Sequence, residues 1–303
     1  LLEKINLLKK IQLSLWEALL NNFHCKMIPK KIIYLTTSRS DYDLIKPLII
    51  QNKRTNKILL ITGSHLEKKF GNTISQIKRD KLNVNKIIKI DIQTKNRQYM
   101  INNSIAIGLN KFSKSLIKEK PDLVIILGDR FEALSFAIAC YTLKYPIAHL
   151  HGGEITKGSL DNGFRNSITK MSRLHFVSNF KHKIRLINMG EKKKDIYDFG
   201  SLGVENALKI KLKSKSEIQK KLKFTMMKNN LLVCFHPNTT FRDKKKIKKE
   251  FSDLISALRK FKEIYYIFTS PNNDPGGLEI MREIKKFVKK NKNAIYFPNL
   301  GQK

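Results

Sequence analysis

The sequence predicts an α/β protein with two Rossmann-like doubly wound domains, in which helices cover both faces of parallel sheets. The chain has 303 residues, and because single domains usually hold about 100–200 residues, two domains are expected. Short β-branched runs alternate along the chain with segments whose apolar residues recur at helical spacing. Polar or ionisable residues follow many of these runs, whose interiors are almost purely apolar.

The first series of elements begins after Lys30. Its apolar runs are too continuous for strands with one solvated face, so they predict a parallel sheet that is buried on both sides. The expected strands are KIIYLTTS (31–38), KILLITGSH (57–65), KIIKIDI (86–92), DLVIILGD (122–129), PIAHLHGGE (146–154) and LHFVSN (174–179). The helices expected between them span 41–51, 71–79, 101–117, 131–143 and 165–172.

The second series follows a pause in the alternation around DIYDFGSLGVENALKI (195–210). It contains the expected strands LLVCFHPN (231–238), IYYIFTSPN (264–272) and AIYFP (294–298), with helices over 243–261 and 278–290. We place the first domain at 27–205 and the second at 206–303. Three strands are fewer than a doubly wound domain normally has, so we expect the second domain to be incomplete, with an exposed edge strand.

Residues 1–26 precede the first expected strand and are predicted to form a helical N-terminal extension. Apolar residues recur there at helical spacing, at Leu1, Ile5, Leu8, Ile11 and Leu15. Charged residues interrupt the segment too often for the core of a signal peptide. A basic amphipathic helix lying on a membrane is the alternative, and we favour an extension without a function of its own.

The net charge of +35, from 60 basic and 25 acidic residues, would by itself suggest a polyanionic partner. The basic residues are mainly lysines on the expected outer faces of helices, without the interleaved aromatics of a base-stacking groove. We therefore expect no nucleic-acid partner and no membrane partner. Cys25, Cys140 and Cys234 are far apart and lack CxxC spacing, which favours a cytoplasmic protein without a zinc site or a disulfide framework.

The candidate functional residues lie at the ends of the expected strands, where ligands of open parallel sheets bind. They are Arg39 and Asp41, His65, Asp129 and Arg130, His151 and Glu154, His236, and Ser270, Asn272 and Asp274. Each has an ordinary explanation when taken singly: an Asp before a helix is commonly an N-cap, and DPGG is a turn by composition. Such residues nevertheless follow strand after strand in both expected domains. This recurrence predicts that they line one cleft between the domains.

The residue types at these strand ends match the needs of a sugar nucleotide. Arginines and histidines near helix N-termini suit a diphosphate, and carboxylates suit acid–base chemistry on the group attached to it. No GxGxxG, Walker or DFG-like motif is present, so dinucleotide oxidation and ATP-dependent phosphoryl transfer lack their sequence signatures.

The motifs LTTSRSDY, ITGSHLEKKFGNT, LGDRFEA, HLHGGEITKGSLD, SITKMSRLHFVS, GSLGVENAL, FHPNTT and SPNNDPGG occur in this order. Together they resemble the hydrolysing UDP-N-acetylglucosamine 2-epimerases of sialic-acid-type sugar biosynthesis, from about Lys30 to about Gly277. The resemblance implies a glycosyltransferase-B-like fold with the active site between the domains. It also implies a homo-oligomer that uses no cofactor and no metal. The implied reaction converts UDP-N-acetylglucosamine and water to UDP and N-acetylmannosamine, by elimination of UDP to a glycal and rehydration.

The resemblance assigns roles by motif position. Asp129, Glu154 and Asp161 are the acid–base candidates for catalysis, and their individual roles stay open. Arg39, His65, Arg130 and His236 are expected to bind the substrate, with the two arginines and His236 neutralising charge on the departing diphosphate. Arg165, one helical turn after Asp161, is expected to hold a carboxylate or the substrate, with a surface arginine as the alternative. Ser270 and Asn272 are expected to contact the nucleotide.

The sequence departs from the family pattern in three places. Asn162 follows Asp161 where the family usually has an acidic residue, and Asn166 stands where a His is expected. Asn cannot transfer a proton, so activity depends on whether that His only forms hydrogen bonds. The family also has a serine-rich loop that binds the diphosphate, and residues 27–303 do not contain it. We therefore expect residues 27–303 alone to be inactive or unstable.

Three other functions stay open at this point. The same reaction could act on another nucleotide-linked acetamido sugar, as in a legionaminic-type pathway. The chain could instead be a glycosyltransferase of the same fold, which would need an acceptor. A non-catalytic module that binds polyanions through its +35 charge is the third alternative.

Overall fold

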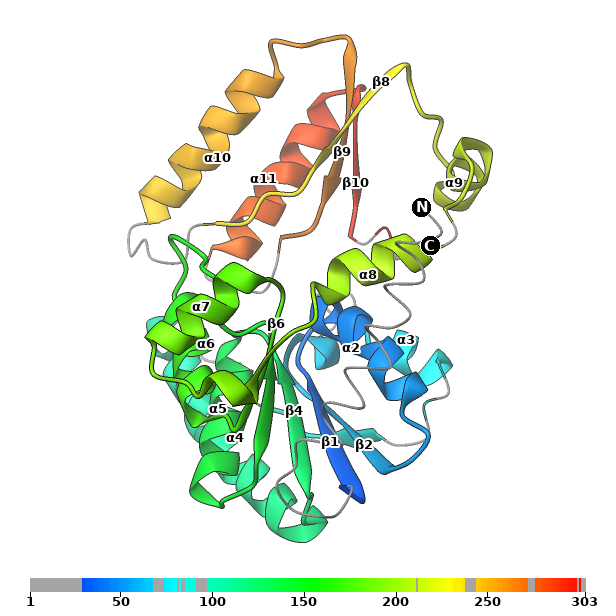
Figure 1. Cartoon of the computed structure of the whole chain (residues 1–303). Coiled ribbons are helices and arrows are strands. Elements are labelled where there is room, and N and C mark those ends of the chain that lie inside the picture. The colour runs from blue at the N-terminus through cyan, green and yellow to red at the C-terminus, as the bar shows by residue number, and fades with distance from the viewer. Residues whose placement is uncertain are drawn as a thin grey trace. The chain divides into compact units, whose positions relative to one another are not determined.

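The computed structural model describes residues 29–67, 73–80, 82, 85–90, 97–210, 212–237, 244–271, 276–298 and 300. The predicted N-terminal helix (1–26) and Asn272 lie outside these residues. The chain divides into two compact units, of which the first holds most of the chain up to Lys209 and the second holds Ile210–Lys303. Each unit is an α/β layer structure with its own core (Figure 1).

The first unit is built on a seven-stranded sheet in the order β3-β2-β1-β4-β5-β6-β7, and every pair of neighbours is parallel. The strands are β1 (Lys31–Thr36), β2 (Asn56–Ile61), β3 (Asn85–Ile87), β4 (Leu123–Leu127), β5 (Ile147–Leu150), β6 (Leu174–Val177) and β7 (Ile196–Asp198). The six strands predicted for this region are confirmed. β7 was not predicted, because three residues are too few to show a periodicity.

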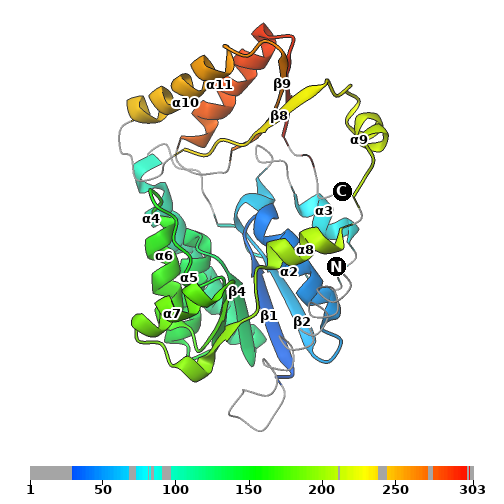
Figure 2. The same ribbon diagram turned by 45° about the horizontal axis from the view of Figure 1, so that its top comes forward.

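Helices cover both faces of this sheet. They are α2 (Arg39–Gln51), α3 (Ile74–Arg79), α4 (Arg97–Glu119), α5 (Phe131–Thr142), α6 (Asp161–Met171), α7 (Phe180–Asn188) and α8 (Leu202–Lys209), with short 3-10 turns at Gly63–Leu66 and Lys193–Asp195. Helices α2 and α8 contact each other and lie side by side in both views (Figures 1 and 2). Helices α4, α5 and α6 contact one another in that order.

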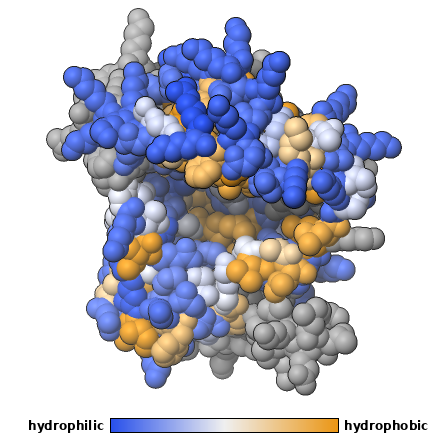
Figure 3. Space-filling view, turned by 90° about the horizontal axis from the view of Figure 1, so that it is seen from above, coloured by the Kyte–Doolittle hydropathy of each residue, from blue (hydrophilic) through white to orange (hydrophobic). Residues whose placement is uncertain are grey.

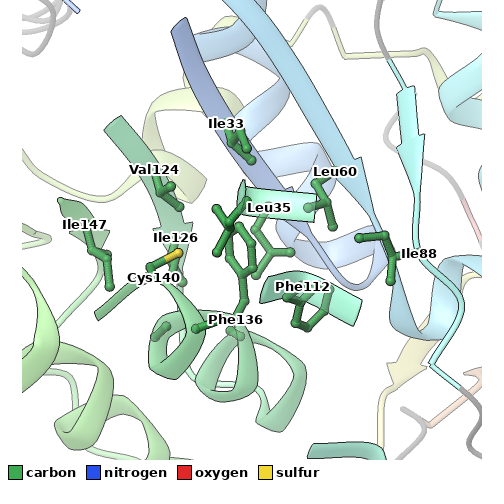
Figure 4. Close-up of a cluster of buried hydrophobic side chains, with 14 of the residues drawn as sticks. Ile33, Leu35, Leu60, Ile88, Phe112, Val124, Ile126, Phe136, Cys140 and Ile147 are labelled. Carbon is green, nitrogen blue, oxygen red and sulfur yellow. The ribbon is translucent and has the colours of Figure 1, made fainter. Parts of the chain in front are cut away.

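The alternation of side chains along each strand produces two separate cores. Ile32 and Tyr34 of β1 join the cluster under α2, α3 and α8, whereas Ile33 and Leu35 join the cluster under α4, α5 and α6. In the second cluster the strand residues point toward Phe112 of α4 and toward residues of α5 (Figure 4). Burial on both faces explains why these strands read as continuous apolar runs.

The second unit contains a parallel sheet in the order β10-β9-β8. Its elements are α9 (Lys215–Leu222), β8 (Asn229–Val233), α10 (Lys244–Leu258), β9 (Ile264–Thr269), α11 (Gly277–Lys290) and β10 (Ala294–Phe297). The three predicted strands and two predicted helices are confirmed, and α9 lies in the lysine-rich stretch before them.

The core of the second unit lies between the sheet and helices α10 and α11. Phe251, Phe268 and Phe287 are central members of this cluster. Hydrophilic residues dominate the molecular face that carries these helices, with hydrophobic residues between them (Figure 3). At the edge of the described sheet, Leu231 and Leu232 of β8 are 43% and 54% exposed. None of the described helices is long and apolar enough to cross a bilayer.

Candidate active site

The turn between β1 and α2 is fixed by the buried carboxylate of Asp41. Asp41 accepts hydrogen bonds from the backbone N–H groups of Thr37 (2.8 Å) and Ser38 (2.9 Å) and from the Thr36 hydroxyl (2.8 Å). Burial alone would raise the pKa of Asp41, but His65 and these hydrogen bonds outweigh burial and lower it. Arg39 is the first residue of α2, so this turn fixes the position of its backbone.

His65 is fully buried behind this turn. Its Nε2 atom lies 2.8 Å from the Thr36 hydroxyl, and its Nδ1 atom lies 2.7 Å from the Thr73 hydroxyl. Both ring nitrogens therefore have protein partners, and the imidazole is placed to hold the loops after β1 and β2. The predicted contact between His65 and the substrate stays a prediction.

Arg130 begins the turn into α5, and Glu132 orients it. The guanidinium donates to the Glu132 carboxylate at 3.2 Å, and Glu132 is fully buried. Burial raises the pKa of Glu132, and the positive charge of Arg130 opposes this effect. Gly63 has φ +62°, and a Cβ atom there would lie 2.8 Å from Glu132 Oε1. The ends of β2 and β4 are thus packed tightly around this ion pair.

Asp129, at the end of β4, forms an ion pair with Arg165 of α6. The residue at the N-cap of α5 is Arg130, so the alternative in which Asp129 serves as the N-cap is wrong. Arg165 also donates to the backbone carbonyl of Glu154 at 2.7 Å. Arg165 is only 5% exposed, so the alternative of a surface arginine is wrong as well. This one guanidinium joins the loop after β4 to the loop after β5.

His149 of β5 supports the peptide that precedes Asp129. Its Nε2 atom lies 2.8 Å from the carbonyl of Gly128, and its Nδ1 atom lies 3.1 Å from the Thr169 hydroxyl. Because a carbonyl only accepts, Nε2 carries the proton and Nδ1 accepts from Thr169. Burial lowers the pKa of His149 to about 3, so the imidazole is neutral at physiological pH.

The Glu154 carboxylate is contacted by two hydrogen-bonding side chains, one of which is bonded to a third. The His151 Nδ1 atom lies 3.0 Å from Glu154 Oε1, and the Ser178 hydroxyl donates to the same oxygen at 2.7 Å. His182 Nδ1 lies 2.9 Å from that hydroxyl. Burial alone would raise the pKa of Glu154, but His151 and Ser178 outweigh burial and lower it. Glu154 is therefore held as a carboxylate.

Asp161 is the first residue of α6, and Arg165 follows it by four residues. Residues four apart lie on the same face of a helix, so Asp161 stands on the face from which Arg165 reaches Asp129. The structure thus brings the three predicted carboxylates to neighbouring elements at the carboxyl edge of one sheet. That they share one sugar ring stays a prediction.

The two asparagines that depart from the family pattern also lie on α6. The Asn162 side-chain oxygen accepts a 3.4 Å hydrogen bond from the backbone N–H of Thr156. The side-chain oxygen of Asn166 is buried and has no hydrogen-bond partner within the described part of the chain.

Two of the predicted substrate-binding residues, His236 and Ser270, follow strands of the second unit. His236 is exposed after β8, and the Ser270 hydroxyl, after β9, is hydrogen-bonded to the hydroxyl of Tyr296 in β10. Their contacts with a ligand stay predictions. Across the residues that the structure describes, no three His, Cys, Asp or Glu side chains are grouped as metal ligands.

Sequence reasoning did not include several residues of this network among its site residues. His149, Ser178 and Glu132 were not chosen, although each lies in or beside one of the quoted motifs, and His151 was a candidate without an assigned role. Ser178 follows β6 directly, so the rule that strand ends carry function would have found it. Glu132 gives no such signal, because a Glu in the first turn of a helix is common.

The fold and the site define an α/β protein with a cluster of carboxylate, histidine and arginine side chains at the carboxyl edge of a parallel sheet. Comparison with known families matches residues 49–303 to the UDP-N-acetylglucosamine 2-epimerase family. The chain belongs to this family.

Two curated relatives support the same assignment. The chain is 37% identical to the polysialic acid biosynthesis protein P7 of Escherichia coli, over 87% of this chain and 67% of that protein. It is 34% identical to the GDP/UDP-N,N'-diacetylbacillosamine 2-epimerase (hydrolyzing) of Campylobacter jejuni, over 91% of this chain and 72% of that protein.

A solved structure shares the fold. The UDP-GlcNAc 2-epimerase of Neisseria meningitidis, bound to UDP-GlcNAc, matches with a TM-score of 0.70 at 14% identity, over 89% of this chain and 72% of that one. The predicted glycosyltransferase-B-like fold class agrees with this likeness.

Proposed function

We propose that the protein is a hydrolysing 2-epimerase that converts UDP-N-acetylglucosamine and water to UDP and N-acetylmannosamine. The observation that carries this proposal is the cluster of Asp129, Arg165 and Glu154, in a chain of the 2-epimerase family. Carboxylates at the carboxyl edge of a parallel sheet are placed to act on a sugar whose nucleotide binds nearby.

The reaction has two steps with different demands. In the first, the C2 proton leaves as the bond between C1 and the diphosphate oxygen breaks, so a base must act while charge grows on the UDP. In the second, water adds to C1 of the glycal, and an acid protonates C2 from the other face. Two separate proton-transfer groups are therefore required, together with cations for the diphosphate.

The residues of the first unit meet these demands. Asp129, Glu154 and Asp161 are the acid–base candidates, and Arg39 and Arg130 stand at the ends of β1 and β4, where a diphosphate would meet the N-termini of α2 and α5. Asp129 is ion-paired with Arg165, and hydrogen bonds from His151 and Ser178 lower the pKa of Glu154.

Product analysis by NMR in deuterated water tests the proposal. Incubation with UDP-N-acetylglucosamine should release UDP and N-acetylmannosamine with deuterium at C2, because the proton that returns to C2 comes from solvent. Release of the epimerised sugar without deuterium would exclude the elimination route. Sugar transfer to an added acceptor, without free N-acetylmannosamine, would favour a glycosyltransferase.

A second substrate class is favoured by the relatives themselves. A further relative, at 33% identity, is the UDP-N,N'-diacetylbacillosamine 2-epimerase (hydrolyzing) of Legionella pneumophila, whereas the UDP-N-acetylglucosamine 2-epimerase of Neisseria meningitidis is 29% identical. Competition between UDP-N-acetylglucosamine and UDP-N,N'-diacetylbacillosamine in one reaction, read as the ratio of the two kcat/KM values, distinguishes these substrates.

A further inference from the structure

His151 stands beside Glu154 in an arrangement that the proposed roles leave unexplained. It follows β5 directly and has φ +63°, a left-handed conformation that non-glycine residues rarely adopt. The side chain is 14% exposed, and Nδ1 lies 3.0 Å from Glu154 Oε1. A histidine is retained in a backbone conformation that suits glycine, and the neighbouring Gly152 and Gly153 show that the loop tolerates glycine.

The hydrogen bonds around this pair fix which ring nitrogen carries the proton. Glu154 is a carboxylate, so it accepts from His151 Nδ1–H, and His151 Nε2 is left as an acceptor. The only donor that the described residues offer to Nε2 is the backbone N–H of Leu202, at 3.4 Å. A bond of that length is weak, so a stronger interaction with a bound ligand can replace it.

Glu154 itself is arranged as the fixed member of the pair. One oxygen of its carboxylate accepts from both His151 and Ser178, and His182 holds Ser178 in turn. A carboxylate with a lowered pKa is a poor base, and hydrogen bonds of this kind reduce its basicity further. The same negative charge stabilises an imidazolium beside it, as in carboxylate–histidine pairs generally.

We propose that His151 is the base that removes the C2 proton and that Glu154 is the positioning residue that orients it. This inference rests on the proposed function. The C2 proton moves to Nε2, the electrons of the C2–H bond form the C1–C2 double bond, and the electrons of the C1–O bond leave with UDP. The imidazolium then loses its proton to solvent before the next turnover. Asp129 and Asp161 stay available for the hydration step.

Charged and titratable groups surround His151. Glu154 lies on the same loop, His149 on β5 and His182 on α7, and Arg165 and Arg185 lie near His182. Removing the Glu154 carboxylate takes away the acceptor that orients the ring but leaves the imidazole in place.

Two variants separate this assignment from one in which Glu154 is the base. His151→Asn keeps a residue type that tolerates the left-handed conformation. It should lower kcat by about 10²–10⁴-fold, with KM nearly unchanged. It should also abolish the acidic limb in the pH dependence of kcat/KM. Glu154→Gln should keep that limb. His175→Gln removes an imidazole from another carboxylate pair, with Glu191 at 3.2 Å, and should leave the limb in place.

The outcome that overturns the proposal is the reverse pattern, in which the limb survives in His151→Asn and disappears in Glu154→Gln. If the intact protein releases no UDP from any nucleotide sugar, that result counts against the proposed function alone. The assignment of the ring proton can then still be tested by a measurement that needs no turnover. Nitrogen-15 NMR of the intact protein should show His151 as the Nδ1–H tautomer. An Nε2–H tautomer would overturn the proposal.

Discussion

The strand ends of the two units differ in how their polar residues are held. In the first unit, Asp41, His149 and Arg165 are buried and bonded to backbone groups of neighbouring loops. In the second unit, His236 is exposed, and the Ser270 hydroxyl is bonded to another side-chain hydroxyl. The first arrangement fixes side chains before a substrate arrives, as acid–base chemistry requires, and the second suits contacts that only add binding free energy.

The largest effect is expected from Arg165→Met, because it breaks the link between the loops after β4 and β5. Asp129 would lose its ion pair and the Glu154 carbonyl its 2.7 Å donor. We expect kcat to fall at least ~10²-fold and the free energy of unfolding to fall by about 2–4 kcal/mol, since an uncompensated carboxylate is left half-buried.

Steady-state kinetics and urea unfolding measure these two losses. Arg165→Lys is the matched control, because it keeps the charge but cannot bridge both loops. An Arg165→Met variant with wild-type turnover would remove the contrast between the two units.

His149→Gln should have the next largest effect, and its sign depends on pH. The folded pKa of about 3 lies below the ordinary value near 6.5, so the unfolded chain binds the proton more readily. The contribution of neutral His149 to stability is complete above about pH 6.5 and is lost as the pH falls toward 3.

Urea unfolding of the wild type and of His149→Gln at pH 7.5 and 5 measures this dependence. The wild type should lose more stability over this interval than the variant, whose glutamine does not titrate. Equal losses would mean that His149 is not the neutral donor to Gly128.

The sequence predicted the strands of the first unit well but not the pairing of its polar residues. The runs around Ile33 and Val124 identify themselves as strands because burial on both faces demands apolar side chains throughout. Arg165, by contrast, was expected to hold a carboxylate or the substrate, and its partner Asp129 lies 36 residues earlier. Such pairings depend on the order of strands in the sheet, which local spacing does not contain.

Gly63→Ala tests how tightly the ends of β2 and β4 are packed. A Cβ atom there would lie 2.7 Å from the Thr37 carbonyl and 2.8 Å from the Glu132 carboxylate, in addition to the strain of φ +62°. We expect a loss of about 2–3 kcal/mol and a several-fold rise in KM as Arg130 shifts with Glu132.

Gly190→Ala is the matched control for Gly63→Ala in thermal unfolding. Gly190 has φ +89°, but the nearest atom to a Cβ there is Lys170 Nζ at 3.9 Å. An alanine there would therefore destabilise the protein through conformational strain alone, by about 1–2 kcal/mol. Equal losses in the two variants would mean that the space around Gly63 is not restrictive.

The smallest effect is expected from Ser270→Ala in the second unit. Its hydroxyl is bonded to Tyr296, and the loss of one partly exposed hydrogen bond costs about 1 kcal/mol or less. If Ser270 contacts the nucleotide as predicted, KM should rise several-fold while kcat and its pH profile stay unchanged. Tyr296→Phe removes the same bond but keeps the serine, so it should lower stability similarly without raising KM. A fall in kcat with unchanged KM in Ser270→Ala would mean that the second unit also takes part in positioning the reacting groups, and the contrast between the units would then be one of burial alone.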